Sequence, residues 1–505
     1  MRSKRAFQNI LSSVVLQIIT VLTGIYIPQL MIRTYGSDIN GMVSSITQFI
    51  SYLSLVEAGV SNAAIVALYT PLANDDKVAV NQVMSATKIF YIKSGIAFVA
   101  LLLTLIIFYP FFVNNEIDPS MVRWMVLILG SSFIVDYFFL GKYRVILTAN
   151  QKGYVITTVQ SVGTVFNSIL TIVLIYAKCD ILLVKLAATI VYILRAIYIY
   201  YYVKKNYGYL DYKETPNYDA LKQKWDVLVH QITGVIVNST DVVVLTVALK
   251  NMAEVSVYTT YNLIVSNIIT LVDSFSNGLC AGFGEAFAKG EKNVVKASYS
   301  TYEYIYFIIA FAGCCCLGCL FIPFMKLYTV NITDENYIRP VTAVLFTIIT
   351  LCRGIRTPAL TMIMAVGHYK QTRKAAILEA SINITISFLL VYPFGINGVL
   401  LGTICSYLYR TLDIIIYTSR NIIPGTIKKT SMRILRNLIL SCVIMFFVNN
   451  DLELNSWIAL LGYALVFGIG VIVAFVMVNG ILEFNELRNV CKTVKGLYIS
   501  KRSKS

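Results

Sequence analysis

The sequence predicts an all-α polytopic membrane protein with about 14 transmembrane helices, built as two parallel-repeat six-helix bundles plus two C-terminal helices. Three observations predict this fold class. Of the 505 residues, 57% are hydrophobic and only 13% are charged. Apolar segments of about 20 residues recur along the chain with short breaks between them. Residues of similar type also recur at one constant spacing along the sequence, which is the spacing between Glu57 and Asp273.

The composition argues against a soluble fold, because soluble domains carry about 25% charged residues. The net charge of +16 does not indicate a nucleic-acid partner. The basic residues lie in short loops between apolar runs, which is the pattern of cytoplasmic loops. Membrane lipids are therefore the expected surroundings, and nucleic acid is not an expected partner.

The predicted spans begin at the N-terminus. Its apolar run is too long for a signal peptide, and this part of the chain lacks a small-residue cleavage site. The second segment carries Glu57, which we expect in the middle of a helix. The thirteenth segment is the shortest of the set. The predicted spans are 9–32, 42–70, 89–112, 122–148, 155–177, 181–203, 226–249, 256–286, 301–325, 340–365, 375–393, 398–418, 434–449 and 456–480.

Lysine and arginine counts predict the orientation. The loops on the side of the N-terminus and the C-terminal tail hold about four times as many basic residues as the opposite loops. Both termini are therefore expected in the cytoplasm, with an even number of spans between them. Two loops stand out on that side, Lys204–Lys224 and Arg420–Arg436.

The constant offset predicts a duplication whose seam lies in the first of these loops. Six spans per copy give both copies the same orientation, so the repeat is parallel. The predicted domains are a first bundle over residues 1–216, a second over 217–424, and two further helices with a basic tail over 425–505. Residues that match at this offset include Asp38 with Glu254, Glu57 with Asp273, Arg123 with Arg339, Ala149 with Ala365, and Asn167 with Asn383.

Enzyme signatures are missing from the sequence. It contains no Walker A, G-x-S-x-G or H-E-x-x-H motif. The cysteine cluster Gly313–Cys319 has no histidine or carboxylate nearby, so packing residues in a membrane helix explain it better than a metal site. We expect no enzyme activity, no cofactor and no metal.

Charged residues at membrane depth are the candidate functional residues, because a charge on the lipid face would cost several kcal/mol. Arg353 and Arg356 are three residues apart on one helix face, and two guanidinium groups suit a pyrophosphate. The alternative is that they pair with acids such as Asp241 or Glu379. Arg33, at the outer end of the first span, is a third candidate or an interface anchor. The candidate ion-coupling or cavity carboxylates are Glu57, Asp136, Asp241 and Asp273.

Two segments and the predicted architecture resemble a known family. They are NGMVSSITQFISYLSLVEAGVSNAAI (Asn40–Ile65) and LTANQKGYVITTVQSVGTVFN (Leu147–Asn167). The chain resembles the polysaccharide-transporter branch of the multidrug/oligosaccharidyl-lipid/polysaccharide (MOP) exporter superfamily, and in particular the Wzx-type oligosaccharide repeat-unit flippases. The resemblance extends over essentially the whole chain and includes no catalytic signature.

The resemblance implies a central cavity lined by cationic residues, with Arg33, Arg353 and Arg356 as candidates. It implies that the protein moves undecaprenyl-diphosphate-linked oligosaccharide repeat units across a bacterial cytoplasmic membrane by alternating access. The products would be capsule, O-antigen or exopolysaccharide, with a polymerase and other polysaccharide-assembly proteins as partners. Two alternatives remain open: a cation-coupled drug or metabolite exporter of the same fold, and a membrane polymerase or glycosyltransferase, which the short outer loops disfavour.

Overall fold

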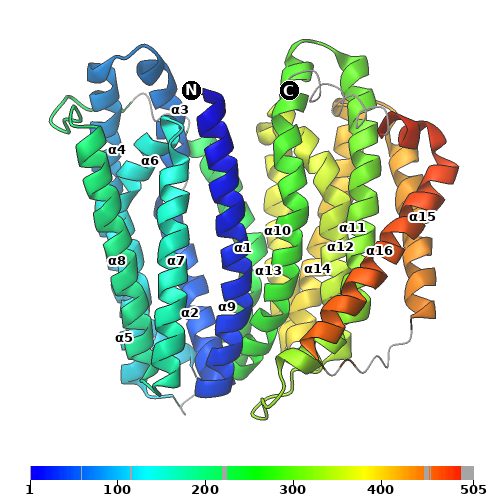
Figure 1. Cartoon of the computed structure of the whole chain (residues 1–505), viewed down its shortest axis with the longest axis horizontal. Helices are drawn as coiled ribbons and strands as arrows, with labels where there is room; N and C mark the ends of the chain where they lie inside the picture. Colours follow the sequence, from blue (N-terminus) through cyan, green and yellow to red (C-terminus); the bar gives the residue numbers. More distant parts are fainter. Residues whose placement is uncertain are drawn as a thin grey trace. The chain divides into compact units, whose positions relative to one another are not determined.

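The chain folds into helices throughout the part that the structure describes (Figure 1). This computed structural model contains no β-strand in that part. The helices form two compact units. The structure describes residues 2–57, 60–113, 117–218, 224–448, 454 and 456–490.

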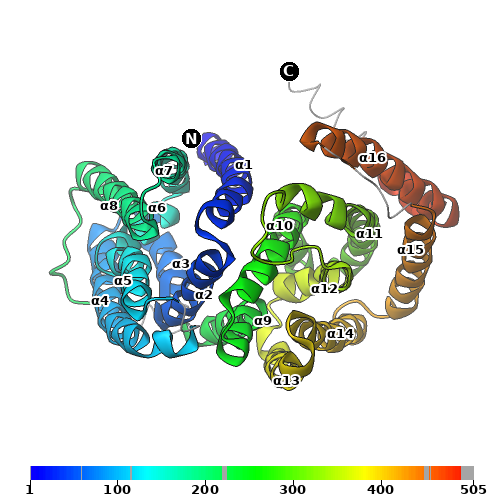
Figure 2. The same ribbon diagram turned by 90° about the horizontal axis from the view of Figure 1, so that it is seen from below.

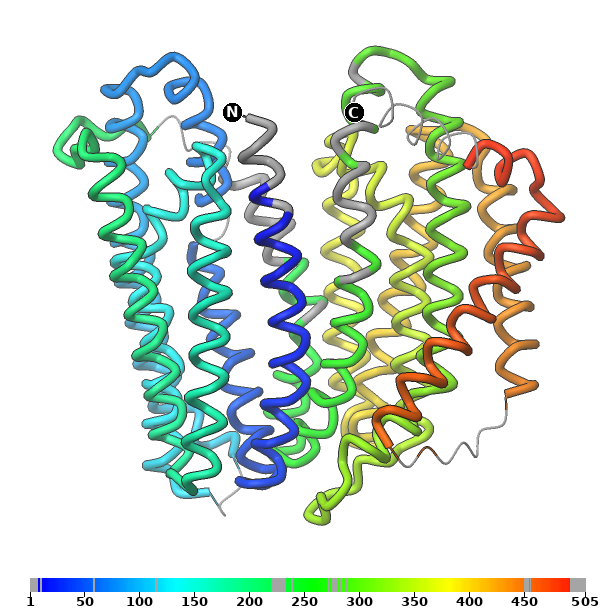
Figure 3. The backbone as a smooth tube through the Cα atoms, in the orientation of Figure 1, coloured from blue at the N-terminus to red at the C-terminus, as the bar shows by residue number. Residues whose placement is uncertain are grey.

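The first unit spans residues 1–260 together with 332–335. Figure 3 traces its backbone from the blue α1 onward. Its helices are α1 (Arg2–Tyr35), α2 (Ser37–Leu53), α3 (Val60–Ala73), α4 (Lys77–Phe108), α5 (Pro119–Val135), α6 (Gly141–Ala149), α7 (Gly153–Tyr176), α8 (Ile181–Asn206), α9 (Lys224–Leu249) and the first residues of α10 (Met252–Ala288).

The second unit contains residues 261–331 and 336–505. Its helices are the remainder of α10, α11 (Lys292–Tyr328), α12 (Pro340–Val366), α13 (Tyr369–Phe394), α14 (Ile396–Asn421), α15 (Ile427–Phe447) and α16 (Trp457–Leu482). The boundary between the compact units follows contacts, whereas the predicted boundary at residue 216 follows the sequence repeat. The repeat boundary stays a prediction.

Local sequence sets where several helices begin. Asp76 accepts a hydrogen bond from the Ala79 amide (3.0 Å) at the start of α4. Asp118 caps α5 in the same way, and Pro119 occupies its first position. Both are standard solutions for amide groups that lack a partner within the helix. The polar breaks between apolar segments therefore act as helix caps as well as loops.

The described residues contain 12 helices long and apolar enough to cross a membrane. Their outer faces are apolar: Phe446 and Ile458 are each 85% exposed. Lipid, rather than water, is the solvent that such faces suit. The prediction of an all-α multi-pass membrane protein is confirmed. The count of 14 stays a prediction, because parts of α9 and α10 lie outside the residues whose side chains are described.

The second predicted span is not one continuous helix, so the expected mid-helix position of Glu57 is wrong. A 3₁₀ turn, Ser54–Glu57, separates α2 from α3. Side chains from other helices bond the carbonyls at this break. The Tyr137 hydroxyl donates to the Ser54 carbonyl (2.9 Å), and the Ser94 hydroxyl donates to the Val56 carbonyl (3.3 Å). The break is tolerated because these backbone groups find partners inside the protein.

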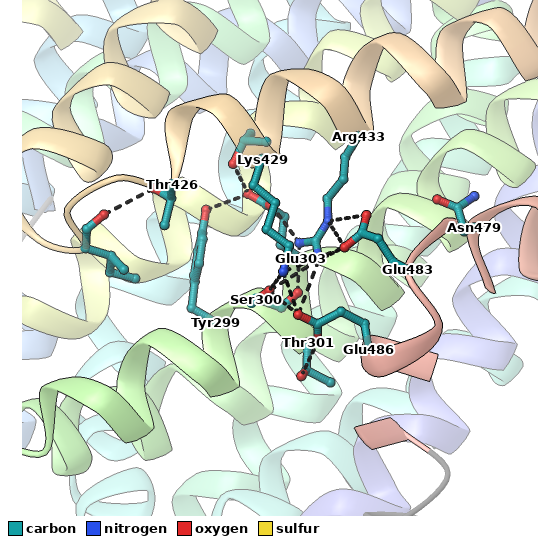
Figure 4. Close-up of polar contacts among 12 residues, drawn as sticks. Tyr299, Ser300, Thr301, Glu303, Thr426, Lys429, Arg433, Asn479, Glu483 and Glu486 are labelled. Carbon is teal, nitrogen blue, oxygen red and sulfur yellow. Dashed lines mark hydrogen bonds and ion pairs between the residues drawn. The ribbon is translucent and has the colours of Figure 1, made fainter. Parts of the chain in front are cut away.

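The segment Arg420–Arg436 is also not a loop throughout, because α15 begins at Ile427. Arg433 therefore lies in a helix, and its side chain is only 1% exposed. Its guanidinium bonds Glu303 of α11 (2.9 Å) and Glu483, which follows α16 (2.5 Å; Figure 4). The basic residues of this stretch include structural groups. The basic tail after residue 490 lies outside the described residues.

A larger polar network surrounds Arg433 and joins three helices. Both α15 and α16 pack against α11. In the network, three basic and three acidic side chains balance each other's charge, so the group as a whole is neutral. It attaches the two C-terminal helices to the second unit. Its ionic members are Lys429, Arg433, Arg436, Glu303, Glu483 and Glu486.

Replacing Arg433 is predicted to destabilise the protein strongly. In Arg433→Ala, the buried Glu303 loses its counter-charge, which typically costs about 3–5 kcal/mol. We expect a clear drop in the melting temperature of the purified, detergent-solubilised protein. Lys428→Ala is the matched control, because Lys428 is exposed on the same helix. Equal melting temperatures for the two variants would contradict this role for Arg433.

Candidate functional site

The charged residues at membrane depth form separate groups within each unit. In the first unit, Asp136 begins a π-helical turn, Asp136–Leu140, between α5 and α6. Arg144 of α6 forms an ion pair with it, and the Tyr192 hydroxyl of α8 donates to its other oxygen (3.0 Å). The Asp136 side chain is 12% exposed. Asp136 is therefore held on both oxygens by side chains from neighbouring helices.

Glu57 lies beside this group without joining the ion pair. Its carboxylate accepts a hydrogen bond from the Tyr91 hydroxyl of α4. Electrostatic interactions also connect Glu57 with Asp136 and Arg144. Tyr91 is only 1% exposed and packs against Gly141, where an added Cβ would lie 2.1 Å from its ring. Glu57 thus faces a rigidly held hydroxyl donor.

The other two candidates in the first unit differ from each other. Asp241 on α9 is 4% exposed, and the Tyr258 hydroxyl donates to it (2.8 Å). Arg33 is exposed in the last turn of α1. A cation at that position interacts favourably with the C-terminal end of the helix dipole. This placement suits an interface anchor, which was one of the two interpretations of Arg33.

In the second unit, Arg353 of α12 forms a half-exposed ion pair. Its Nη2 lies 3.2 Å from Oδ2 of Asp273 on α10, and the two side chains are 30% and 31% exposed. The Tyr306 hydroxyl of α11 donates to the same carboxylate (3.5 Å). A cavity of about 20 Å³, lined in part by Thr350, lies beside the pair and has room for about one water molecule.

Arg356 belongs to a different and more deeply buried group. Its Nη1 lies 2.6 Å from Glu379 of α13, and its guanidinium stacks 4.1 Å from the ring centre of Tyr407. Arg410 of α14 contacts the other oxygen of Glu379 (3.4 Å) and also pairs with Asp413 (2.6 Å). The Arg356 and Glu379 side chains are 11% and 8% exposed. Two arginines and two carboxylates neutralise one another here.

Arg353 and Arg356 therefore face different neighbours although they lie one turn apart on α12. The pairing of Arg356 with Glu379 was one of the alternatives that the sequence left open. Their joint binding of a pyrophosphate stays a prediction. Of the two, Arg353 has the accessible guanidinium.

A set of polar contacts within the first unit was not predicted from the sequence. Hydroxyl and amide side chains of α2 bond those of α9 and α10, and Figure 2 shows α2 and α9 side by side. The pairs are Asn40 with Ser256 (2.8 Å), Ser45 with Thr246 (2.6 Å) and Tyr52 with Thr240 (2.7 Å). We call these three pairs the α2–α9/α10 contact.

The backbones approach closely at one end of this contact. A Cβ at Gly41 would lie 1.7 Å from the Met252 carbonyl oxygen, so only glycine fits there. The Ala253 amide also donates to Asp38 (3.0 Å). The charge bias of the loops predicts that this end lies on the outer side of the membrane. The available signal was the repeat itself, because Asn40 and Ser256 stand 216 residues apart, the offset of the duplication.

Comparisons with solved structures identify the fold. An inward-facing multidrug resistance MATE family transporter of the MOP superfamily aligns with a TM-score of 0.65 and 15% identity, over 83% of this chain and 96% of its own. The lipid II flippase MurJ, in an inward closed conformation, aligns with a TM-score of 0.68 and 17% identity, over 95% and 100%. An outward-facing MATE transporter aligns with a TM-score of 0.57 and 13% identity, over 86% of this chain and 96% of its own. No protein-family model and no curated protein sequence matches the chain.

The chain therefore has the fold of these transporters. The resemblance to the MOP superfamily is confirmed at the level of the fold, whereas the Wzx-type branch stays a prediction. The expectation that the chain is not an enzyme stays a prediction.

A methyl group at Gly41 is predicted to disrupt the α2–α9/α10 contact. Gly41→Ala would force α2 away from the Met252 carbonyl, and overpacking of this kind costs about 1–3 kcal/mol. We expect a lower melting temperature in detergent. Gly462→Ala on α16 is the control, because an added Cβ there meets no atom within 4 Å. The prediction fails if Gly41→Ala is as stable as Gly462→Ala.

Proposed function

We propose that this protein moves lipid-linked oligosaccharides, joined to undecaprenyl diphosphate, from the inner to the outer leaflet of a bacterial cytoplasmic membrane. Both termini would lie in the cytoplasm, as the distribution of basic residues predicts. The transported repeat units would supply capsule, O-antigen or exopolysaccharide synthesis, with a polymerase and other polysaccharide-assembly proteins as partners. Nucleic acid has no part in this function.

The extent of the structural matches is the observation that carries the proposal. The match to the lipid II flippase covers 95% of this chain, whereas the inward-facing multidrug transporter covers 83%. The share left unmatched by the transporter is about 86 residues of 505. The more complete match to the lipid II flippase therefore favours a flippase of lipid-linked substrates over a drug exporter.

The geometry of Arg353 supports contact with an anionic substrate. Its guanidinium is accessible and bonds Asp273, whose carboxylate also accepts a hydrogen bond from the Tyr306 hydroxyl. A guanidinium can donate two parallel hydrogen bonds to one phosphate group. Arg353 could exchange its bond to Asp273 for one to a diphosphate. For Arg356, which Glu379 and Tyr407 enclose, we propose a structural role instead.

The α2–α9/α10 contact supports transport by alternating access. Hydrogen bonds between membrane helices are worth on average about 0.6 kcal/mol each. Three such bonds therefore contribute only about 2 kcal/mol, which is small enough to break and form again in each cycle.

A cation-coupled drug or metabolite exporter is the second candidate, and the MATE matches favour it. It predicts ion-driven efflux of small molecules and drug sensitivity when the gene is deleted. A deletion strain distinguishes the two. The proposed function predicts lipid-linked repeat units that accumulate in the inner leaflet and a loss of surface polysaccharide. Normal surface polysaccharide without a redundant gene would overturn it.

Single substitutions of the two arginines are predicted to fail for different reasons. Arg353→Ala should lower flipping by purified protein in liposomes about tenfold to a hundredfold, since a hydrogen bond to a charged group contributes about 1.5–3 kcal/mol. Its melting temperature should stay close to wild type. Arg356→Ala should instead lower the melting temperature, because Glu379 loses a buried partner. Wild-type flipping by Arg353→Ala would exclude Arg353 from substrate binding.

A further inference from the structure

We propose that Lys88, Lys142 and Tyr212 bind the phosphate group of an anionic phospholipid in the cytoplasmic leaflet. This inference goes beyond the proposed function and does not depend on what the protein transports. It starts from residues 207–217, which lie in the first of the two basic segments that stand out in the sequence. We call them the α8–α9 segment, because they follow α8 and precede α9. Figure 1 shows the segment at the same end of the first unit as the start of α4.

Hydrogen bonds hold the α8–α9 segment against the first turns of α4. The Asn81 side-chain amide donates to the Tyr209 carbonyl (3.1 Å), and its oxygen accepts from the Asp211 amide (3.2 Å). The Asn217 amide donates to the carbonyl of the residue that follows Asn81 (3.2 Å). The path of the segment is therefore fixed both before and after Tyr212.

Each tyrosine of the α8–α9 segment has a lysine over its ring. The Nζ atom of Lys152 lies 4.8 Å from the ring centre of Tyr207, and that of Lys77 lies 5.6 Å from the ring centre of Tyr209. An aromatic face attracts a cation because its π electrons carry partial negative charge. At these two positions, one lysine meets one ring.

Tyr212 differs because two lysines share its ring. The Nζ atom of Lys88 on α4 lies 5.4 Å from the ring centre, and that of Lys142 on α6 lies 5.3 Å from it. None of the ion pairs among the described residues includes either lysine. The two ammonium groups repel each other, and a ring without net charge does not neutralise them. An anion beside the ring would neutralise both.

The Tyr212 hydroxyl is the third group of the site. Its oxygen is buried and has no hydrogen-bond partner within the part of the chain that the structure describes. A buried hydroxyl without a partner is costly. A phosphate accepts hydrogen bonds on several oxygens, so it would give this hydroxyl a partner while it neutralises the two ammonium groups.

The depth of the site in the membrane matches that of lipid phosphates. Lys88 directly precedes the predicted apolar span 89–112, and Lys142 lies about 10 Å from the end of α6 at Ala149. Lipid headgroups lie just outside the hydrocarbon core, and lysine stems carry their ammonium groups out to that level. The charge bias of the loops predicts that this end is cytoplasmic. Basic pockets between transmembrane helices on that side suit anionic headgroups.

The surroundings favour a phospholipid over other molecules that carry phosphate. The Nζ atom of Lys142 also lies 5.1 Å from the ring centre of Tyr143, whose ring packs edge-on against that of Tyr200 (6.0 Å). Tyr200 and Tyr201 on α8 are 38% and 64% exposed. Exposed tyrosines near the end of a transmembrane helix are typical of the membrane–water interface. The site is therefore continuous with a surface of the kind that phospholipids contact.

Native mass spectrometry of the full-length protein in detergent tests the site. The probes are phosphatidylglycerol, which is anionic, and phosphatidylcholine, which carries the same phosphate group but no net charge. We expect the wild type to bind its first phosphatidylglycerol about tenfold to thirtyfold more tightly than phosphatidylcholine, because two lysines act on one headgroup. The double variant Lys88→Gln/Lys142→Gln should lose most of this preference.

Three further variants separate the site from the general charge of the protein. Lys77→Gln/Lys152→Gln removes the same charge from the two lysines that each face one ring, and it should keep the preference. Lys88→Arg/Lys142→Arg keeps the charge and should bind phosphatidylglycerol as the wild type does. Tyr212→Phe keeps the ring but loses one hydrogen bond, so it should bind phosphatidylglycerol about threefold to tenfold more weakly.

Equal losses in the two double glutamine variants would overturn the proposal, because binding would then follow net charge alone. Displacement of the first phosphatidylglycerol by an equal concentration of inorganic phosphate or undecaprenyl diphosphate would assign the site to that molecule and would overturn it as well. If Lys88→Gln/Lys142→Gln does not fold, Tyr212→Phe decides. Wild-type affinity of Tyr212→Phe for phosphatidylglycerol would then exclude the site.

Discussion

The structure depends on the requirement that charges within a membrane protein be neutralised by one another. The Arg433 group shows this most clearly, because a guanidinium that is 1% exposed bonds carboxylates from two other helices. Without such partners, α15 could not carry basic residues into the protein interior. The same requirement explains why Arg356 lies between Glu379 and Tyr407. The most buried ion pairs therefore connect segments that lie apart in the sequence.

Neutral polar side chains have a different role. The α2–α9/α10 contact consists of hydrogen bonds between hydroxyl and amide groups. Each bond contributes little free energy, because the same groups find other hydrogen-bond partners when the helices separate. Close backbone approach at Gly41 brings these groups within reach. The first unit thus contains a contact that is specific in geometry but weak in energy. The second unit thus relies on ion pairs, whereas this contact of the first unit relies on neutral hydrogen bonds.

The sequence predicted the helical fold because long apolar segments report membrane spans directly. Hydropathy did not reveal the break at Glu57, since the residues on both sides are equally apolar and the partners of the broken helix, Ser94 and Tyr137, are distant in sequence. Hydropathy also placed the start of α15 too late. Arg433 and Arg436 are typical of a loop as long as their acidic partners are not known. The spacing of Arg353 and Arg356 predicted a shared face. Which helices cover that face depends on packing, so their separate partners could not be derived from spacing alone.

The hydrogen bond between Asn40 and Ser256 bears on how the two copies of the chain diverged. These residues occupy equivalent positions in the two copies of the predicted duplication, and they touch each other. In a symmetric pair of identical subunits, a residue at this place would meet its own counterpart. The predicted duplication, by joining the two copies in one chain, would release it from that identity. One side could then become an amide donor and the other a hydroxyl acceptor, a complementary pair that no homodimer can encode at a self-contacting position.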